Sequence, residues 1–177
     1  MDCNPELIAA AQNNTDKLGF SDRFALHTRE LADTRFLENL RMEASPVQLV
    51  MANPPWRLVG SGRLPATEAR RKALFGDKGT FPLFTSAASS LLEEDGRFAC
   101  IISPDRLQDM LAALDGAGLT PYLLQYIHKQ KTSPATFVLI EARKGAHAKP
   151  SVAEPITLYG PERFFTLESL AFCPFLR

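Results

Sequence analysis

The sequence predicts an open α/β fold, in which a sheet of mostly parallel strands ends in an antiparallel hairpin. Apolar strand-like segments alternate along the chain with amphipathic helix-like segments, a pattern typical of parallel sheets covered by helices. The last two strong strands, 122–128 and 136–142, have a connection between them that is too short for a parallel crossover. We therefore expect these two strands to form a hairpin at the end of the sheet.

In the first half of the chain, the clearest signal is an apolar helix that begins near Leu7. Asn4 is a suitable N-cap, Pro5 suits the first helical turn, and Gly19 marks the exit of the helix. The other elements predicted in this half are a short strand over 23–27, a charged helix over 31–43 and an apolar strand over 47–52.

The second half begins with a loop rich in Gly, Pro and Arg, from Arg57 to about Gly79. A helix is predicted over 81–94 because its apolar residues share one face, and Gly96 follows it. After that helix, the sequence predicts a buried strand over 97–103, a helix over 105–117, the hairpin, and a strand-like segment over 155–159.

The composition predicts a single globular domain over residues 1–177, because this length can bury a core. The 20 Lys and Arg residues balance the 20 Asp and Glu residues, so no bulk positive charge indicates a nucleic-acid partner, although a local patch can supply one. The sequence leaves the oligomeric state open.

Three cysteines, Cys3, Cys100 and Cys173, lie too far apart to indicate a zinc site or a disulfide framework, and we expect free thiols and no metal. No apolar run reaches the length of a membrane span, and the first residues are unlike a signal peptide. A cytoplasmic protein without a membrane partner is therefore expected.

The segment 50–56 ends a strand with Asn53, Pro54, Pro55 and Trp56, which are the candidate catalytic residues. Ligands of open α/β sheets bind beyond the carboxyl ends of the strands, and the prolines lack N–H groups, so nearby carbonyls stay free to accept hydrogen bonds. The Asn53 side-chain oxygen and the Pro54 carbonyl can hold both N–H groups of a planar amine. Trp56 can stack on its ring, which is worth about 1–3 kcal/mol for a nucleobase. The alternative is a rigid Pro-Pro turn with a packed tryptophan.

Two acidic residues follow the ends of other predicted strands. Asp2 follows Met1, which looks like the last residue of a truncated strand. An acidic side chain at such a strand end can accept hydrogen bonds from ribose hydroxyls, although near a helix N-terminus it also interacts with the helix dipole. Glu30 follows the strand over 23–27 and can accept a hydrogen bond from an adenine amino group, although a solvated surface carboxylate is the alternative.

A group of basic residues follows the Asn-Pro-Pro-Trp segment and could contact phosphates near the site. The alternative is a solvated loop without a partner. The basic residues are Arg57, Arg63, Arg70, Arg71 and Lys72.

The order of Asp2, Glu30 and Asn53-Pro54-Pro55-Trp56 resembles motifs two, three and four of class I S-adenosylmethionine-dependent methyltransferases that act on amino groups. Later segments narrow the resemblance to the tRNA(Val) adenine-N6 methyltransferase family, from residue 2 almost to the end. Those segments are Arg70-Arg71-Lys72-Ala73-Leu74, Gly96-Arg97-Phe98, Ser103-Pro104, and the runs 133–145, 156–160 and 165–168.

The resemblance implies a Rossmann-like methyltransferase sheet with S-adenosyl-L-methionine as cofactor and tRNA as partner. Asp2 would bind the cofactor ribose and Glu30 its adenine, where the family usually has Asp. Asn53 and Pro54 would hold the target amine, with Asn53 also beside the cofactor. Trp56 would stack on the base, where the family more often has Tyr, and the basic group would contact tRNA phosphates.

Motif one, a glycine-rich turn after the first strand, has no counterpart in this chain. In the family that strand lies in the middle of the sheet, between the second and fourth strands, so we expect a sheet that lacks its first strand. We also expect this chain to bind S-adenosylmethionine poorly, an expectation that micromolar binding in isothermal titration would contradict.

Two alternatives to the tRNA methyltransferase remain. A protein glutamine N5-methyltransferase also uses Asn-Pro-Pro and an aromatic residue to hold a planar amide, so the substrate could be a protein. A non-catalytic remnant that binds RNA or another partner is the second alternative, and the missing motif one favours it.

Overall fold

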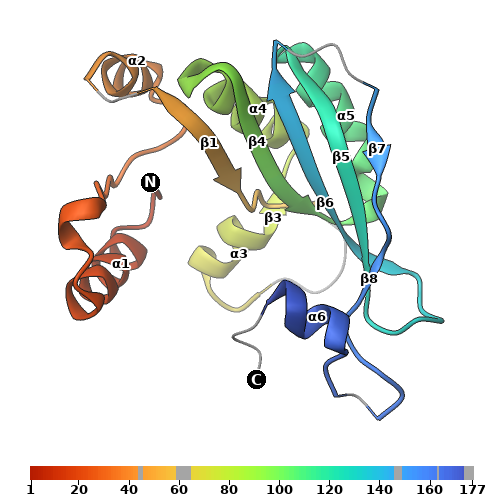
Figure 1. The fold of residues 1–177 in the computed structure, drawn as a ribbon. Helices are drawn as coiled ribbons and strands as arrows, with labels where there is room; N and C mark the ends of the chain where they lie inside the picture. The colour runs from red at the N-terminus through yellow and green to blue at the C-terminus, as the bar shows by residue number, and fades with distance from the viewer. Residues whose placement is uncertain (44–45, 59–64, 146–148, 163, 174–177) are drawn as a thin grey trace.

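The computed structural model describes residues 1–43, 46–58, 65–145, 149–162 and 164–173, and it confirms the predicted α/β fold (Figure 1). The central sheet has the strand order β1-β4-β6-β5-β7, and β8 also pairs with β5. Within these residues β6 is the one reversed strand of the sheet, antiparallel to both β4 and β5. The sheet strands are β1 (Val47–Ala52), β4 (Leu92–Ile102), β5 (Leu119–His128), β6 (Ala135–Lys144), β7 (Ser151–Val152) and β8 (Ile156–Thr157).

Helices lie before the first strand of this sheet, between its strands and after the last one. Two very short strands, β2 (Arg57–Leu58) and β3 (Phe75–Gly76), form a second, separate sheet. The helices are α1 (Pro5–Leu18), α2 (Thr34–Glu43), α3 (Glu68–Leu74), α4 (Thr80–Leu91), α5 (Leu107–Gly116) and α6 (Leu167–Phe172), with 3-10 turns η1 (Ser21–Arg23) and η2 (Pro104–Arg106). None of the described helices is long and apolar enough to cross a membrane.

Several predictions from the sequence hold closely. The β5–β6 hairpin is antiparallel, as its short connection requires, and β1 has the predicted bounds. The first helix starts at Pro5, the Asn4 side chain accepts a hydrogen bond from the Glu6 N–H, and Gly19 ends the helix with a left-handed φ of 71°.

Three predictions were wrong. The strand predicted over 23–27 is instead a 3-10 turn followed by extended chain, and its one sheet-like contact is the parallel bridge between Asp2 and Thr28. A strand needs a neighbour along its length, and this segment has one only at that bridge. The loop predicted over 57–79 contains α3, β2 and β3. The helix predicted over 81–94 ends at Leu91, because the fully buried Leu92 already starts β4.

The hydrophobic core lies between the sheet and helices α4 and α5, which cover the same face of the sheet (Figure 1). The buried Thr85 hydroxyl of α4 lies 3.0 Å from the Ala113 carbonyl of α5 and donates a hydrogen bond that joins the two helices. Each large apolar side chain buried here contributes about 1.5–3 kcal/mol. The large side chains of this core include Phe81, Leu92, Phe98, Ile102, Met110, Leu114, Leu119, Val138 and Ile140.

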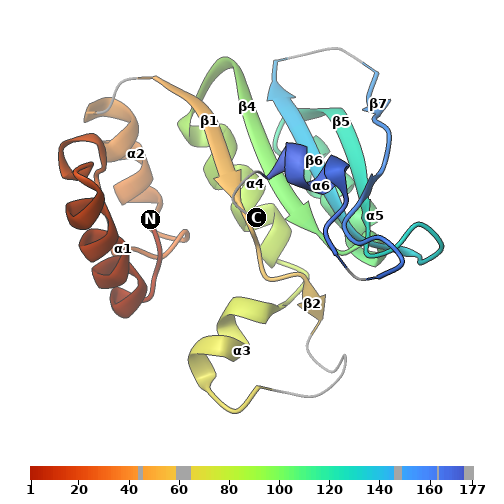
Figure 2. The same ribbon diagram turned by 60° about the horizontal axis from the view of Figure 1, so that its bottom comes forward.

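The outer edge of β1 is open: among the described residues, β1 pairs with β4 alone. Leu49 and Met51 of this strand are exposed, Met51 to 76%. Figures 1 and 2 both show α1 on the side of β1 away from β4, while α2 packs against α4. The N-terminal segment with the Asp2–Thr28 bridge is therefore not hydrogen-bonded to the central sheet through any described residue.

Candidate functional site at the carboxyl end of β1

Asn53 lies where the sequence places it, directly after β1, and its side chain is exposed rather than turned into the core. The parallel ladder between β1 and β4 ends at the pair Ala52 and Cys100, because Pro54 and Pro55 have no N–H to continue it. The amide of Asn53 is thus presented at the same edge of the sheet at which β4 ends.

The loop 53–56 is packed tightly from behind. Pro54 is among the most deeply buried residues of the described chain. Gly76 of β3 approaches so closely that a Cβ atom there would lie 2.7 Å from the Pro55 carbonyl oxygen and 2.6 Å from Thr80 Oγ1. The short β2–β3 pair, with Arg57 opposite Phe75, holds the residues that follow Trp56. The loop therefore has a defined backbone path and leaves Asn53 exposed.

Trp56 is half-buried, and its indole has one aromatic neighbour and one cationic neighbour. Its ring meets Phe137 of β6 in a T-shaped arrangement, with the ring centroids 6.1 Å apart. The Arg57 guanidinium lies 5.3 Å from the centroid of the indole ring, a cation–π distance. The Trp56 ring therefore lies beyond the carboxyl end of β1 and already stacks with a cation, and its stacking on a substrate ring stays a prediction.

Arg106 is a residue of this site that the sequence analysis missed. Its Nη1 donates a 2.8 Å hydrogen bond to the Trp56 carbonyl, fifty residues earlier in the chain. The available signal was its position, because Arg106 closes η2 directly after Ser103-Pro104, at the carboxyl end of the strand next to β1. Phe137 was missed as well, since nothing in its own segment distinguishes it from other apolar strand residues.

A parallel bridge joins Asp2 to Thr28, two residues before Glu30, and the cofactor-binding role of the two acidic residues stays a prediction. The Asp2 N–H donates to the His27 carbonyl and the Arg29 N–H donates to the Asp2 carbonyl, each at 3.1 Å. The Asp2 carboxylate itself accepts a 2.8 Å hydrogen bond from the Asn4 N–H, so it also supports the turn that leads into α1. The position of Asp2 is therefore compatible with a hydrogen bond to a ribose hydroxyl and with an interaction with the dipole of α1.

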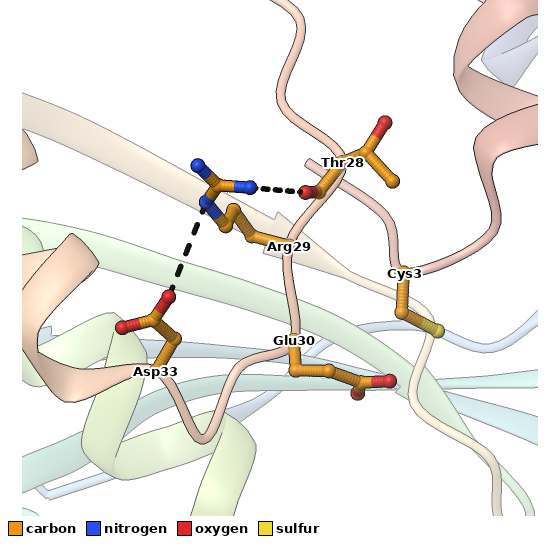
Figure 3. A pocket seen from close by; sticks show the side chains of 5 residues that line it. All are labelled: Cys3, Thr28, Arg29, Glu30 and Asp33. Atoms are coloured by element: carbon orange, nitrogen blue, oxygen red, sulfur yellow. Dashed lines mark hydrogen bonds and ion pairs between the residues drawn. The ribbon is translucent and has the colours of Figure 1, made fainter.

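A shallow, open surface pocket of about 380 Å³ lies beside this bridge and is lined by the exposed residues Cys3, Thr28, Arg29, Glu30 and Asp33 (Figure 3). Arg29 is engaged within the wall, because its Nε lies 3.9 Å from the Asp33 carboxylate and its Nη1 donates to the Thr28 carbonyl. No hydrogen bond engages the Glu30 carboxylate within the part of the chain that the structure describes. The Glu30 side chain is exposed, so its carboxylate is open to a ligand and to solvent alike, and both interpretations from the sequence stay open.

The predicted basic residues lie on two elements rather than in one loop. Arg57 belongs to β2 and covers Trp56, whereas Arg70, Arg71 and Lys72 are exposed on α3. Lys72 also forms an exposed ion pair with Glu68 at 3.8 Å. Arg63 lies outside the described residues. Across those residues, no group of His, Cys, Asp and Glu side chains is arranged to hold a metal ion.

No protein-family profile and no curated protein sequence matches this chain. Solved structures match its fold. A predicted O-methyltransferase from Agrobacterium tumefaciens aligns over 98% of this chain and 73% of its own, with a TM-score of 0.69 and 20% identity.

Two further solved structures show the same kind of fold. A protein assigned as an rRNA methylase from Clostridium thermocellum covers 81% of this chain and 72% of its own, with a TM-score of 0.52 and 19% identity. An O-methyltransferase family 2 protein from Planctomyces limnophilus, solved with apigenin, covers 81% of this chain and 41% of its own, with a TM-score of 0.50 and 16% identity. The fold of this chain is that of class I methyltransferases, and the tRNA(Val) adenine-N6 family stays a prediction.

Proposed function

We propose that this chain acts in S-adenosylmethionine-dependent methyl transfer to the exocyclic amino nitrogen of adenine in RNA, with tRNA as the substrate class. The observation that supports this most is the exposed Asn53 amide at the carboxyl end of β1, followed by buried Pro54 and half-buried Trp56, in a methyltransferase fold. Ligands of such sheets bind at that edge.

Asn53 and Pro54 supply the acceptors that the amine needs. The exposed Asn53 side-chain oxygen accepts one N–H, and the carbonyl of the buried Pro54 accepts the other once the loop admits the amine. These two bonds draw the nitrogen lone pair out of conjugation with the ring. The indole of Trp56 holds the base in plane, and such positioning lowers the barrier because the reacting atoms meet in a productive orientation. No strong base is required, since the methylated nitrogen can release its proton to solvent.

The residues around the Asp2–Thr28 bridge fit part of the methyl donor. S-adenosylmethionine supplies an electrophilic methyl group when it is bound. Glu30 offers an exposed carboxylate without a hydrogen-bond partner among the described residues, in an open surface pocket, and Asp2 is bridged to Thr28 of the same pocket. Carboxylates accept hydrogen bonds from ribose hydroxyls and from an adenine amino group, which is the donor set of this ligand.

The exposed cations support a nucleic-acid substrate. Arg70 and Arg71 lie on α3, which follows the loop 53–56 in the chain and leads into β3, the strand packed against that loop. Phosphate contacts position a nucleic acid without reading its sequence, so these residues would orient the RNA while the site holds the base.

Radiolabelled methyl transfer tests the proposal. The chain is incubated with labelled S-adenosylmethionine and with tRNA, duplex DNA or a translation release factor, and the modified nucleoside or amino acid is identified by mass spectrometry. Because this chain is expected to bind the donor weakly without a glycine-rich turn, the labelled donor is supplied at high concentration. The product that we expect under these conditions is N6-methyladenosine in tRNA, formed slowly. Asn53→Ala should lower the rate roughly 100- to 1,000-fold, as removal of one preorganised polar group does elsewhere.

Asn13→Ala is the matched control, because Asn13 is an exposed asparagine on α1, and this variant should keep the parent rate. Methylated glutamine in the release factor with unmodified tRNA would assign the chain to protein methylation instead. Absence of transfer to all three substrates, together with absence of donor binding in isothermal titration, would favour the non-catalytic role.

A further inference from the structure

Among the residues that the structure describes, Arg106 is the one charged residue that is buried, and only 3% of its surface is exposed. It closes η2, immediately beyond the carboxyl end of β4. A buried cation without partners destabilises a fold by several kcal/mol, so the groups that surround it indicate why it is retained.

Three groups compensate the Arg106 guanidinium. Its Nε donates to the Asp109 carboxylate at 2.7 Å, and its centre lies 4.5 Å from the centroid of the Phe81 ring. Its Nη1 donates to the Trp56 carbonyl at 2.8 Å. Asp109 is 60% exposed and Phe81 belongs to the core, whereas the Trp56 carbonyl belongs to the candidate site.

The loop 53–56 has few polar contacts of its own to fix it. The β1–β4 ladder ends at Ala52, and Pro54 and Pro55 have no N–H to donate. The Trp56 carbonyl is therefore a point at which an external donor can set the path of the loop. Arg106 reaches it from the end of the neighbouring strand, so the ends of β1 and β4 are joined directly.

The chemistry of arginine matters for this contact. A planar guanidinium offers Nε to one acceptor and Nη1 to another at the same time, which a lysine ammonium on a flexible chain does not reproduce. Because the fixed carbonyl and the indole belong to the same residue, a shift of that peptide group moves the Trp56 ring away from its T-shaped contact with Phe137.

We propose that Arg106 is a positioning residue, which fixes the Trp56 indole for binding of the planar amine substrate. The identity of the substrate rests on the function proposed above, whereas the fixing of Trp56 does not. In this proposal Arg106 does not contact the substrate or the cofactor. It acts through its hydrogen bond to the Trp56 carbonyl.

Fluorescence tests the fixing directly, because Trp56 is the single tryptophan of the chain. We compare the parent with Arg106→Lys and Arg106→Met for emission maximum and for quenching by acrylamide. Arg106→Met should shift the emission to the red and raise the quenching constant, and Arg106→Lys should fall between it and the parent. Far-ultraviolet circular dichroism confirms that each variant is folded.

Arg97→Met is the matched control, because Arg97 is a half-exposed arginine of β4 that forms a loose ion pair with Glu141, and it should leave both signals unchanged. Parent-like quenching in folded Arg106→Met would overturn the proposal. If that variant is unfolded, parent-like quenching in Arg106→Lys would overturn it instead. An equal change in Arg97→Met would do the same.

Kinetics then test the role in substrate binding. With methyl transfer to adenine established for the parent, Arg106→Lys should raise KM for the RNA roughly tenfold, equivalent to the loss of one hydrogen bond to a charged group, and leave donor affinity unchanged. An unchanged KM alongside altered fluorescence would overturn the positioning role. If the parent transfers no methyl group, the proposed function fails while the fluorescence comparison still decides whether Arg106 fixes Trp56.

Discussion

At the scale of single residues, the Asn53 side chain is exposed to solvent, whereas the Trp56 ring is partly covered by other side chains. Asn53 is exposed at the end of β1 and needs no rearrangement to accept hydrogen bonds. The Trp56 ring is packed against Phe137 and lies beneath the Arg57 guanidinium. A base that stacks on this face of Trp56 has to displace that guanidinium, and a phosphate of the same nucleic acid is a suitable partner for the displaced cation.

Cys100 provides a residue-scale prediction about pH. Burial raises the pKa of the Cys100 thiol to about 12 from the ordinary 9.0, because the thiolate is poorly solvated there. The folded state therefore keeps the proton at pH values at which the unfolded thiol has lost it. This contribution to stability is complete below about pH 9 and is lost as the pH rises towards 12.

In alkylation with iodoacetamide at mildly alkaline pH, we expect Cys100 to react far more slowly than the exposed Cys3 of the same molecule. At such pH a thiol with this pKa holds roughly a thousandfold less thiolate than one with the ordinary value. Peptide mapping by mass spectrometry gives both rates in one experiment. Denaturant should make Cys100 as reactive as Cys3, and equal rates in the native protein would contradict the prediction.

At the scale of elements, the short β3 strand supports the loop 53–56 through Gly76. A Cβ atom at Gly76 would lie 2.7 Å from the Pro55 carbonyl, so Gly76→Ala forces the loop or β3 to move. We expect a loss of roughly 1–3 kcal/mol in the free energy of unfolding, the usual cost of overpacking, together with a change in Trp56 emission. Urea denaturation followed by circular dichroism and by fluorescence measures both.

Gly116→Ala is the control for that variant. Gly116 ends α5, and a Cβ atom there would meet no heavy atom within 4 Å apart from its chain neighbours and the backbone of its own helix. Alanine at this position should be neutral or stabilise the helix by about 0.5–1 kcal/mol. Equal stability of Gly76→Ala and the parent would show that the loop accommodates the added methyl group.

The elements that could be predicted from the sequence are those whose partners lie close along the chain or whose apolar pattern is continuous. The β5–β6 hairpin and the bounds of β1 are examples. The strand predicted over 23–27 did not form, because a strand depends on a neighbouring strand, and the residues of the segment do not reveal whether one is present. Helix α3 was missed although Thr67 accepts a hydrogen bond from the Arg70 N–H as an N-cap, so a local signal was present there.

The candidate site divides in the same way. The position of Asn53 at a strand end follows from the strand and the two prolines that stop it, so the sequence contains that information. The contact between Arg106 and Trp56 spans fifty residues and depends on β1 and β4 lying side by side. Such a contact follows from the tertiary arrangement and could not be derived from either segment alone.

At the scale of the whole molecule, the open edge of β1 predicts self-association. An unpaired parallel edge offers N–H and C=O groups to another chain, and Met51 and Leu49 add exposed apolar surface. We expect the sedimentation coefficient to rise with protein concentration. Met51→Lys should weaken that rise, because a charged side chain on an edge strand opposes pairing.

Met42→Lys is the control for the edge, because Met42 is equally apolar and 84% exposed, but it lies on α2. This variant should associate as the parent does. A parent that sediments as a monomer at every concentration, or an equal effect of the two lysine variants, would show that the edge of β1 does not govern association.

The reversed strand β6 has a consequence for how the chain can fold during synthesis. It lies between β4 and β5, although it follows both in the chain. While a ribosome is still making residues 103–134, β4 has β1 as a neighbour and its other edge is vacant. That edge is filled only when Ala135–Lys144 emerges, so the middle of the sheet is completed late and the nascent protein depends on its last third.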